Sequence, residues 1–274
     1  MGFKLVDVKP LETQLTFYNL LGEGGYGDVY SVTLEDVPYP LCLKLIRVIC
    51  ALDSTVHEAT ALAIMRHIRG VPRLVGICLD PPAVLMSMHG RVTLTKFCKV
   101  KPVDEYVLLR IFHTLSGILA LINRWGFSHN DIKASNVTIE NYSEASTTVT
   151  TLIDLGLLSN HEVYPFGKAS DLNSRELEIQ HAKKPWYDPD LFCGRKPTST
   201  GTDMYSFGYM LRSALKLLPK TSSRLRGMTY RALGPLKDRP SFLEARRVIY
   251  NAAMRCKAWD SDLSPDDFSH TNEE

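Results

Sequence analysis

The hydrophobic pattern of this chain changes its period near residue 90, and that change constrains the fold more than any other feature. Before it, short apolar and β-branched runs are separated by glycine and proline, at Thr16–Leu21, Val29–Leu34, Leu41–Val48, Leu74–Cys78 and Ala83–Met88. Runs of this kind predict a five-stranded sheet. Apolar residues at helical spacing over Thr55–Ile68 predict one helix between the strands.

Beyond residue 90 the apolar spacing is that of helices. A stripe from Leu108 to Ile122 predicts one long helix, with Asp104 as its capping residue. Further helices are expected at Asp203–Leu218, Ser223–Ala232 and Ser241–Cys256, the last opened by a Ser241/Glu244 capping box, and short extended runs at Val137–Glu140 and Val149–Ile153. The stretch from there to about Pro189 reads as irregular. The predicted fold class is therefore α+β, with a small β-rich lobe at about 16–88 and a larger helical lobe at about 91–256.

The two ends of the chain bear on its domain bounds, and its composition bears on its partners and its cellular compartment. Residues 1–15 are expected to be an N-terminal extension, and 257–274 an acidic, disordered tail with six acids from Asp260 onward. The net charge of +2 gives no electrostatic footprint for nucleic acid or an anionic membrane. Six cysteines without paired short spacing favour reduced thiols, hence the cytosol or nucleus. We find neither the apolar core of a signal peptide nor an uninterrupted apolar run as long as a membrane span.

The first chemical signal is a glycine-rich turn, Gly22-Glu23-Gly24-Gly25-Tyr26-Gly27-Asp28-Val29, between two strand-like runs. Missing side chains let backbone N–H groups approach phosphates. A plain hairpin turn or a dinucleotide site has the same glycine spacing, so the turn alone leaves these alternatives open. Because a strand rather than a helix follows, the dinucleotide site is less favoured.

The second signal is Lys44, which stands in the apolar run Leu41–Ile46. An unpaired buried ammonium is costly, so this lysine should have an anionic partner unless its head reaches water at a strand edge. Glu58 is the natural candidate. Thr55 and Glu58 also have the spacing of a capping box, which keeps a purely local role for Glu58 open.

The strongest local signal is the segment His129-Asn130-Asp131-Ile132-Lys133-Ala134-Ser135-Asn136, followed 18 residues after Asn136 by Asp154-Leu155-Gly156. A carboxylate, a lysine two residues later, an amide five later and a second carboxylate can supply a base, a phosphate contact and two metal ligands. Taken singly, each could be a turn former. Their joint order favours one site.

From about Thr16 to Cys256 the chain resembles a eukaryotic-type protein kinase in a divergent, minimal form. The resemblance implies a bilobal fold, ATP and Mg²⁺ (or Mn²⁺) as cofactors, and protein substrates. It implies Asp131 as the catalytic base, Lys133 on the transferred phosphate, Lys44 on the nucleotide phosphates and paired to Glu58, and Asn136 and Asp154 as metal ligands. It places the nucleotide against Leu21, Gly22, Glu23, Gly24, Gly25, Tyr26, Gly27, Val29, Cys42, Lys44, Met86 and Met88, the last two in a hinge at Met86–His89.

Later motifs extend the resemblance. The run Trp186-Tyr187-Asp188-Pro189-Asp190 is similar to the A-P-E end of the family's activation segment, with Asp190 one methylene shorter than the usual glutamate. By resemblance, Asp190 is expected to pair with Arg239. Asp203 resembles a residue near the start of the family's next helix, although a simple N-cap is the alternative.

Departures from the family pattern bear on regulation and substrate. Asn130 replaces the arginine that commonly binds a phosphorylated activation segment, so activity is not expected to depend on such phosphorylation. Lys183 stands where Ser/Thr members usually place a threonine that touches the catalytic loop. Leu155 replaces the usual phenylalanine, a change of volume that the core is expected to absorb.

The segment from Asp131 to Asn136 still resembles the Ser/Thr type, closest to the vaccinia-related and casein-kinase-like branch. We therefore expect a Ser/Thr protein kinase, monomeric by default. Two alternatives stay open: a pseudokinase scaffold, indicated by Asn130, Lys183 and Asp190, and a kinase of small molecules. Turnover of ATP on a protein substrate separates the scaffold from the enzyme.

Overall fold

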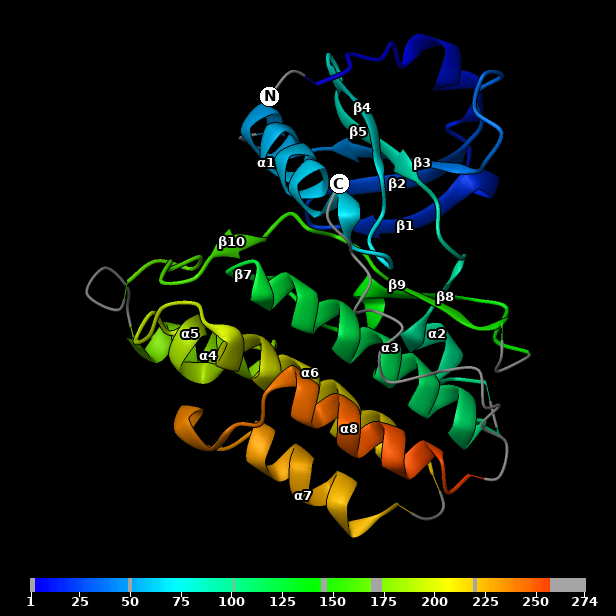
Figure 1. The fold of residues 1–274 in the computed structure, drawn as a ribbon. Helices are drawn as coiled ribbons and strands as arrows, with labels where there is room; N and C mark the ends of the chain where they lie inside the picture. Colours follow the sequence, from blue (N-terminus) through cyan, green and yellow to red (C-terminus); the bar gives the residue numbers. More distant parts are fainter. Residues whose placement is uncertain are drawn as a thin grey trace.

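The chain folds into two lobes, one built around a sheet and one built from helices (Figure 1). The computed structural model describes residues 3–48, 51–100, 102–143, 147–168, 174–218 and 221–256. The expected acidic tail lies outside the described residues. The fold confirms the α+β, bilobal prediction.

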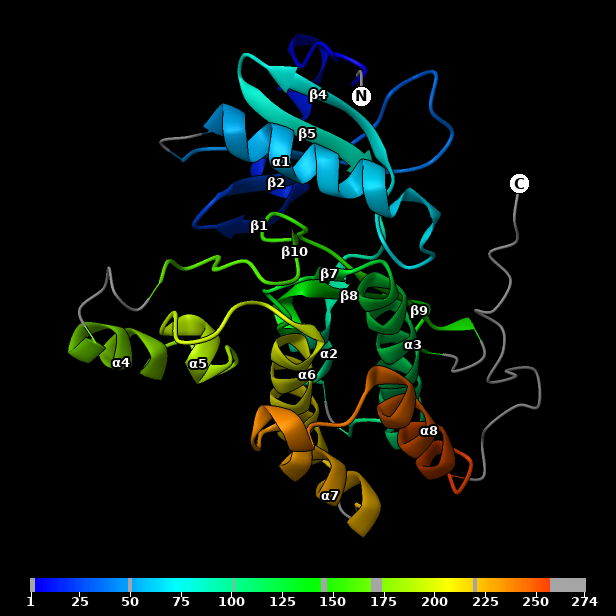
Figure 2. The ribbon, with the colours of Figure 1, turned by 60° about the vertical axis from the view of Figure 1, so that its left-hand side comes forward.

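The smaller lobe contains a five-stranded antiparallel sheet with strand order β1-β2-β3-β5-β4. The strands are β1 (Leu20–Gly24), β2 (Gly27–Val32), β3 (Leu41–Ile46), β4 (Leu74–Leu79) and β5 (Pro82–Ser87). Helix α1 (Ala51–Ile64) packs against β4 and β5, and Figure 2 shows it lying across one face of the sheet. The first strand begins later than predicted, because Phe17–Asn19 form a 3₁₀ turn instead of extended chain.

The first residues extend the smaller lobe. Val6 N–H donates to the Ile77 carbonyl at 2.8 Å, and Ile77 N–H donates to the Lys4 carbonyl at 2.9 Å. Val8 and Leu11 are buried in a small core with residues of β2, β3 and β5. Val8 and Leu11 therefore pack as part of the lobe's core.

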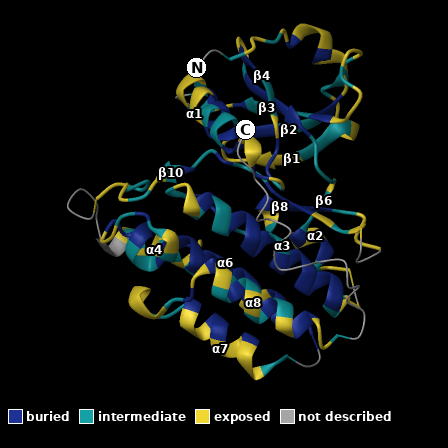
Figure 3. Ribbon diagram, viewed as in Figure 1, coloured by how far each residue is buried: buried dark blue, intermediate teal, exposed yellow. Residues whose placement is uncertain are grey.

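The larger lobe is mainly helical, with short strand pairs at its junction with the smaller lobe. Its helices are α2 (Leu94–Phe97), α3 (Glu105–Arg124), α4 (Ser174–Ala182), α5 (Pro189–Phe192), α6 (Thr200–Leu215), α7 (Ser223–Ala232) and α8 (Phe242–Ala253). Its strands are β6 (Val92–Thr93), β7 (Phe127–Ser128), β8 (Val137–Glu140), β9 (Val149–Leu152) and β10 (Ser159–Asn160). The buried faces of α3 and α6 form the interior of this lobe (Figure 3).

Helix α3 is the central helix of the larger lobe. The Asp104 carboxylate accepts the Val107 N–H at 2.9 Å, which confirms the predicted cap. By length and composition the helix is apolar enough to cross a membrane, but 78% of its most apolar window is buried inside the protein. That burial is typical of the core helix of a folded lobe.

Three details of the helices differ from prediction: the start of α6, the cap of α8 and the presence of α4. Helix α6 begins at Thr200, because a Ser199/Thr202 capping box opens it before Asp203. In α8, Ser241 caps the Glu244 N–H, but the Glu244 carboxylate pairs with Arg231 at 2.6 Å, so the predicted capping box is only half formed. Helix α4 was expected to be irregular chain; it is polar, without an apolar stripe that would signal a helix.

Candidate active site

Lys44 lies at the centre of an ion-pair group between the two lobes. Its ammonium donates to both oxygens of Glu58, at 2.9 and 2.7 Å, and to Asp154 Oδ1 at 2.8 Å. Burial alone would lower the pKa of Lys44, but Glu58 and Asp154 outweigh it and hold the pKa above its usual value. Lys44 is therefore a charged residue in a buried site, and the predicted pairing with Glu58 is confirmed.

The open alternative, a capping box at Thr55 and Glu58, is wrong. Helix α1 extends to Ala51, so both residues lie inside it, and the Thr55 hydroxyl donates to the Ala51 carbonyl at 2.7 Å. The buried face of α1 instead directs the Glu58 side chain, 4% exposed, toward β3. Its partner is tertiary rather than local.

Asp131 is held by three donors. The Tyr187 hydroxyl donates to Oδ1 at 2.7 Å, while Lys133 Nζ and Asn136 Nδ2 donate to Oδ2 at 2.6 and 3.0 Å. Lys133 also lies over the Trp186 ring, 5.8 Å from its centroid. A buried carboxylate held in this way keeps one orientation, as a base that must meet an incoming hydroxyl requires.

The backbone before Asp131 is fixed from helix α6. Asp203, buried inside that helix, accepts the N–H groups of His129 and Asn130 at 2.7 and 3.0 Å. The alternative of a simple N-cap is therefore wrong, since Ser199 caps the helix. Asn130 itself adopts a left-handed conformation, with φ of 64°. Such a conformation is sparsely populated and persists where surrounding contacts determine it.

Asn130 also connects its own loop, His129–Asn136, to the segment after Asp154. Its Nδ2 donates to the Leu157 carbonyl at 2.8 Å and to Ser159 Oγ at 2.9 Å. Leu155, which replaces the usual phenylalanine, is fully buried in the main core, as expected. Neutral contacts thus anchor the start of this segment.

The two residues expected to hold a metal fit that role by their chemistry. Asn136 uses its amide nitrogen on the Asp131 carbonyl at 2.9 Å and on the carboxylate, which leaves its amide oxygen for a cation. Asp154 uses Oδ1 on Lys44, and Lys44 outweighs burial to hold the pKa of Asp154 below its usual value. Ionised Asp154 and Asn136 offer hard oxygen ligands, and Mg²⁺ needs only one or two carboxylates when phosphates supply the rest.

The glycine-rich turn is a hairpin between β1 and β2. Gly27 has φ of 147°, and a Cβ there would lie 1.8 Å from the Leu45 carbonyl oxygen, so only glycine fits. A Cβ at Gly22 or Gly25 would meet nothing within 4 Å, which leaves their backbone open to a ligand. Tyr26, at the tip, lines a small cavity of about 30 Å³ together with residues that include Lys44, Asp131 and Asp154.

The expected hinge joins the lobes after β5. Cys42 on β3 stands opposite Met86 on β5, and both side chains are largely buried. Burial raises the pKa of the Cys42 thiol to about 12, so it stays neutral. The N–H of Met88 donates to the Pro40 carbonyl at 2.9 Å.

The remaining expected nucleotide contacts, Leu21, Glu23, Gly24 and Val29, lie on β1 and β2 beside the turn.

Tyr187 is the residue of this site that the sequence did not reveal. Lys183, which stands where a threonine was expected to touch the catalytic loop, is exposed. The contact with Asp131 comes instead from Tyr187, four residues later. Its closeness to Pro189 was the available signal, but spacing alone does not tell which side chain turns inward.

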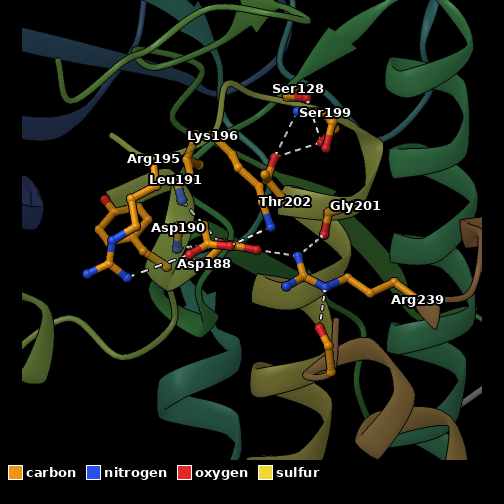
Figure 4. Close-up of polar contacts among 12 residues, drawn as sticks. Ser128, Asp188, Asp190, Leu191, Arg195, Lys196, Ser199, Gly201, Thr202 and Arg239 are labelled. Atoms are coloured by element: carbon orange, nitrogen blue, oxygen red, sulfur yellow. Dashed lines mark hydrogen bonds and ion pairs between the residues drawn. The ribbon is translucent and has the colours of Figure 1, made fainter. Parts of the chain in front are cut away.

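The expected pairing of Asp190 with Arg239 is wrong. Arg239 pairs with Asp188, and both side chains are buried, at 7% and 4% exposed (Figure 4). Asp188 Oδ1 also accepts the N–H groups of Asp190 and Leu191, which caps α5. Asp190 points away and pairs with Lys196 at 2.6 Å. Asp188, the carboxylate before Pro189, faces inward because it caps the start of α5.

This pairing predicts a difference in stability. Asp188→Asn keeps a capping oxygen but leaves Arg239 buried without its counter-charge, and breaking a buried pair costs about 3–5 kcal/mol. Asp190→Asn removes a solvent-exposed pair worth about 1 kcal/mol or less. Urea unfolding of the wild type and of the two variants measures the loss of unfolding free energy that each substitution causes. Equal losses would contradict the assignment of Asp188 as the partner of Arg239.

The fold and the arrangement of these side chains define a two-lobed kinase. Comparison with known proteins agrees: the model of the protein kinase domain matches residues 15–226. The chain therefore belongs to the protein kinase family.

Individual relatives are distant. The chain is 24% identical over 72% of its length to "Probable serine/threonine-protein kinase pats1" of Dictyostelium discoideum, covering 6% of that protein. It is 26% identical over 73% of its length to cyclin-dependent kinase 12 of Caenorhabditis elegans, covering 28% of it. It is 24% identical over 71% of its length to serine/threonine-protein kinase PknK of Mycobacterium tuberculosis, covering 17%. The chain thus spans less than a third of each of these proteins.

Proposed function

We propose that this chain is an active protein kinase that transfers the γ-phosphate of ATP to Ser/Thr hydroxyls of proteins with the help of Mg²⁺ or Mn²⁺. The observation that carries this proposal is the convergence of Lys44, Asp131, Asn136 and Asp154 at one place between the lobes, with Asp131 held in one orientation. The names of two relatives, a probable serine/threonine-protein kinase and a serine/threonine-protein kinase, favour the same acceptor class. The closer relationship to the vaccinia-related and casein-kinase-like branch remains part of the proposal.

In this proposal each residue has a separate task. Lys44, fixed by Glu58, contacts the nucleotide phosphates, and backbone N–H groups of the glycine-rich turn cover them. Asp131 accepts the proton of the acceptor hydroxyl, and Lys133 offers its charge to the phosphoryl group in transfer. A divalent cation on Asp154 and Asn136 would neutralise charge that develops on the phosphates.

The experiment is phosphate transfer from labelled ATP to a mixed-protein extract, followed by phosphoamino-acid analysis. We expect phosphoserine and phosphothreonine with Mg²⁺ or Mn²⁺, and no transfer in excess chelator. Transfer that continues undiminished under chelation would contradict the metal assignment. Phosphotyrosine as the main product would contradict the acceptor class.

A second function, a scaffold that binds a nucleotide or a partner without efficient catalysis, is favoured by one contact. The Tyr187 hydroxyl lies on the proposed base at 2.7 Å, on the oxygen opposite to the one that Lys133 contacts. If this contact blocks the base, nucleotide would bind but phosphate would not be transferred. Binding and turnover measured on the same sample separate the two functions.

We also propose that the protein acts in the cytosol or nucleus, as a monomer, without binding nucleic acid or a membrane. The cysteines of the described residues are free thiols, at Cys42, Cys78, Cys98, Cys193 and Cys256. Free thiols are typical of reducing compartments. Fractionation of cells that express the tagged chain tests this location.

Independence from phosphorylation of the activation segment is a further part of the proposal. Asn130 holds Leu157 and Ser159 through neutral hydrogen bonds, and β10 pairs with β7, so the segment is anchored at its start without a phosphate. We expect phosphatase-treated protein made in bacteria to keep its initial rate within about tenfold, or ~1.4 kcal/mol of barrier. Ser159→Ala and Tyr164→Phe should likewise stay within that range. A hundredfold loss that autophosphorylation restores would contradict this part.

A further inference from the structure

Tyr187 places a phenol hydroxyl on the proposed base in the way that an acceptor hydroxyl would approach it. The hydroxyl donates to Asp131 Oδ1 at 2.7 Å, and the side chain is buried. Burial, and then the Asp131 charge, raise the pKa of Tyr187, so its hydroxyl stays a neutral donor. Both oxygens of Asp131 therefore already accept a hydrogen bond, and Oδ1 has one lone pair left for an acceptor.

The ring of Tyr187 is fixed in this position by other aromatic rings. It stacks on Phe192 at 5.5 Å with an interplanar angle of 20°, and Phe166 meets it edge-on at 4.9 Å. The ring of Trp186, the preceding residue, lies 5.5 Å from the Tyr187 ring between centroids. Lys133 Nζ lies over the same Trp186 ring. Packing of this kind restricts rotamers, so the ring does not leave without breaking the cluster.

The remaining room beside Asp131 is small. The cavity of about 30 Å³ that Asp131 borders lies on the side of Lys44, Glu58 and Asp154, with Tyr26 of the glycine-rich turn on its rim, and Tyr187 does not line it. The hydroxyl oxygen of serine or threonine is bonded to a methylene or methine carbon, whereas the hydroxyl oxygen of tyrosine is bonded directly to a rigid ring. The Tyr187 ring already lies on the Oδ1 side of Asp131, where the ring of a phenolic acceptor bound to that oxygen would have to lie.

We propose that Tyr187 determines acceptor specificity: its hydroxyl positions Asp131, and its ring excludes phenolic acceptors, so that Ser/Thr hydroxyls are used and tyrosine is not. This inference rests on the proposed kinase function. In the transfer, the acceptor oxygen bonds to the γ-phosphorus of ATP, the bond from that phosphorus to the β-γ bridging oxygen breaks, and the acceptor proton passes to Asp131. ADP is the leaving group.

The test uses two peptides that differ only in their acceptor, serine or tyrosine, and compares kcat/KM. For the wild-type protein we expect a preference for serine of about a hundredfold or more, the range that steric exclusion from a pocket reaches. Tyr187→Phe keeps the ring, so the preference should remain. Because the hydroxyl no longer positions Asp131, kcat on the serine peptide should fall by about tenfold, equivalent to ~1.4 kcal/mol, with KM for ATP unchanged.

Tyr187→Ser removes the ring, and here the preference for serine should shrink by about tenfold or more, since room opens for a phenol. Tyr230→Phe is the matched control: this tyrosine is exposed on α7, and its variant should behave as the wild type. A preference that Tyr187→Ser leaves unchanged would overturn the inference. If that variant does not fold, as thermal melting would show, Tyr187→Leu, which keeps apolar bulk in the aromatic cluster but removes the ring, takes its place, and an unchanged preference in it would overturn the inference equally.

Two further results would overturn the inference without the Tyr187→Ser variant. Equal use of both peptides by the wild-type protein would show that the ring excludes nothing. A faster serine reaction in Tyr187→Phe would show that the hydroxyl blocks the base rather than positions it. Absence of transfer to either peptide by nucleotide-bound wild type would instead contradict the kinase function itself, and this inference with it.

Discussion

Asp131→Asn is expected to lower phosphate transfer by about 10²–10⁴-fold, the range that positioned general bases contribute. The carboxylate accepts hydrogen bonds from Tyr187, Lys133 and Asn136, whereas an asparagine must turn its NH₂ group toward some of these donors and cannot take the acceptor proton. Because Asp131 is implied to contact the acceptor and not the adenine, nucleotide affinity should change little. Single-turnover transfer and nucleotide titration measure the two effects separately.

The matched control is Asp190→Asn, the same change at a carboxylate that lies near the surface and pairs with Lys196. Its transfer rate should equal that of the wild type. Near-normal turnover in Asp131→Asn would mean that another group accepts the proton. Equal losses of transfer and nucleotide affinity would indicate damage to the site as a whole.

The second large effect is expected at the ion-pair group. Lys44→Met should lower transfer by about 10²–10³-fold, as loss of one preorganised electrostatic contact does in other enzymes. Glu58→Gln should have a smaller effect, because Asp154 still holds the lysine at 2.8 Å. Since Glu58 is expected to act on the nucleotide only through Lys44, the double variant should lose less than the sum of the single losses, with a coupling energy of ~0.5–3 kcal/mol.

Arg47→Met serves as the control for this cycle. Arg47 follows β3 directly, but its side chain is 63% exposed and pairs with Asp28. It should leave transfer unchanged. A double variant of Lys44 and Glu58 whose loss equals the full sum of the single losses would show that the two residues act independently.

The sequence predicted those parts of the site in which a residue's surroundings along the chain require a particular partner. Lys44 in an apolar strand required an anion, and the structure supplies Glu58 from the helix that helical spacing predicted. Helix α7, from Ser223 to Ala232, and strand β8, from Val137 to Glu140, have the predicted bounds. In each case burial imposes a pattern that neighbouring residues in the chain must satisfy.

Other contacts depend on how distant segments meet, and spacing along the chain does not encode them. Asp188 and Asp190 flank the same proline, and only the capping of α5 turns Asp188 toward Arg239. Tyr187 reaches Asp131 with its ring packed against those of Phe166 and Phe192. Val8, in the expected N-terminal extension, is buried against residues of the sheet, a contact that its local sequence did not indicate. These are tertiary effects that overrule local expectation.

The most direct test of the kinase assignment is the initial rate of γ-phosphate transfer from ATP to a generic protein substrate, measured at saturating nucleotide on wild-type protein and on Asp131→Asn prepared in parallel. We expect transfer to serine and threonine by the wild type and its loss in the variant, while both proteins bind nucleotide. Nucleotide binding without transfer by the wild type, or equal transfer by both proteins, would contradict it.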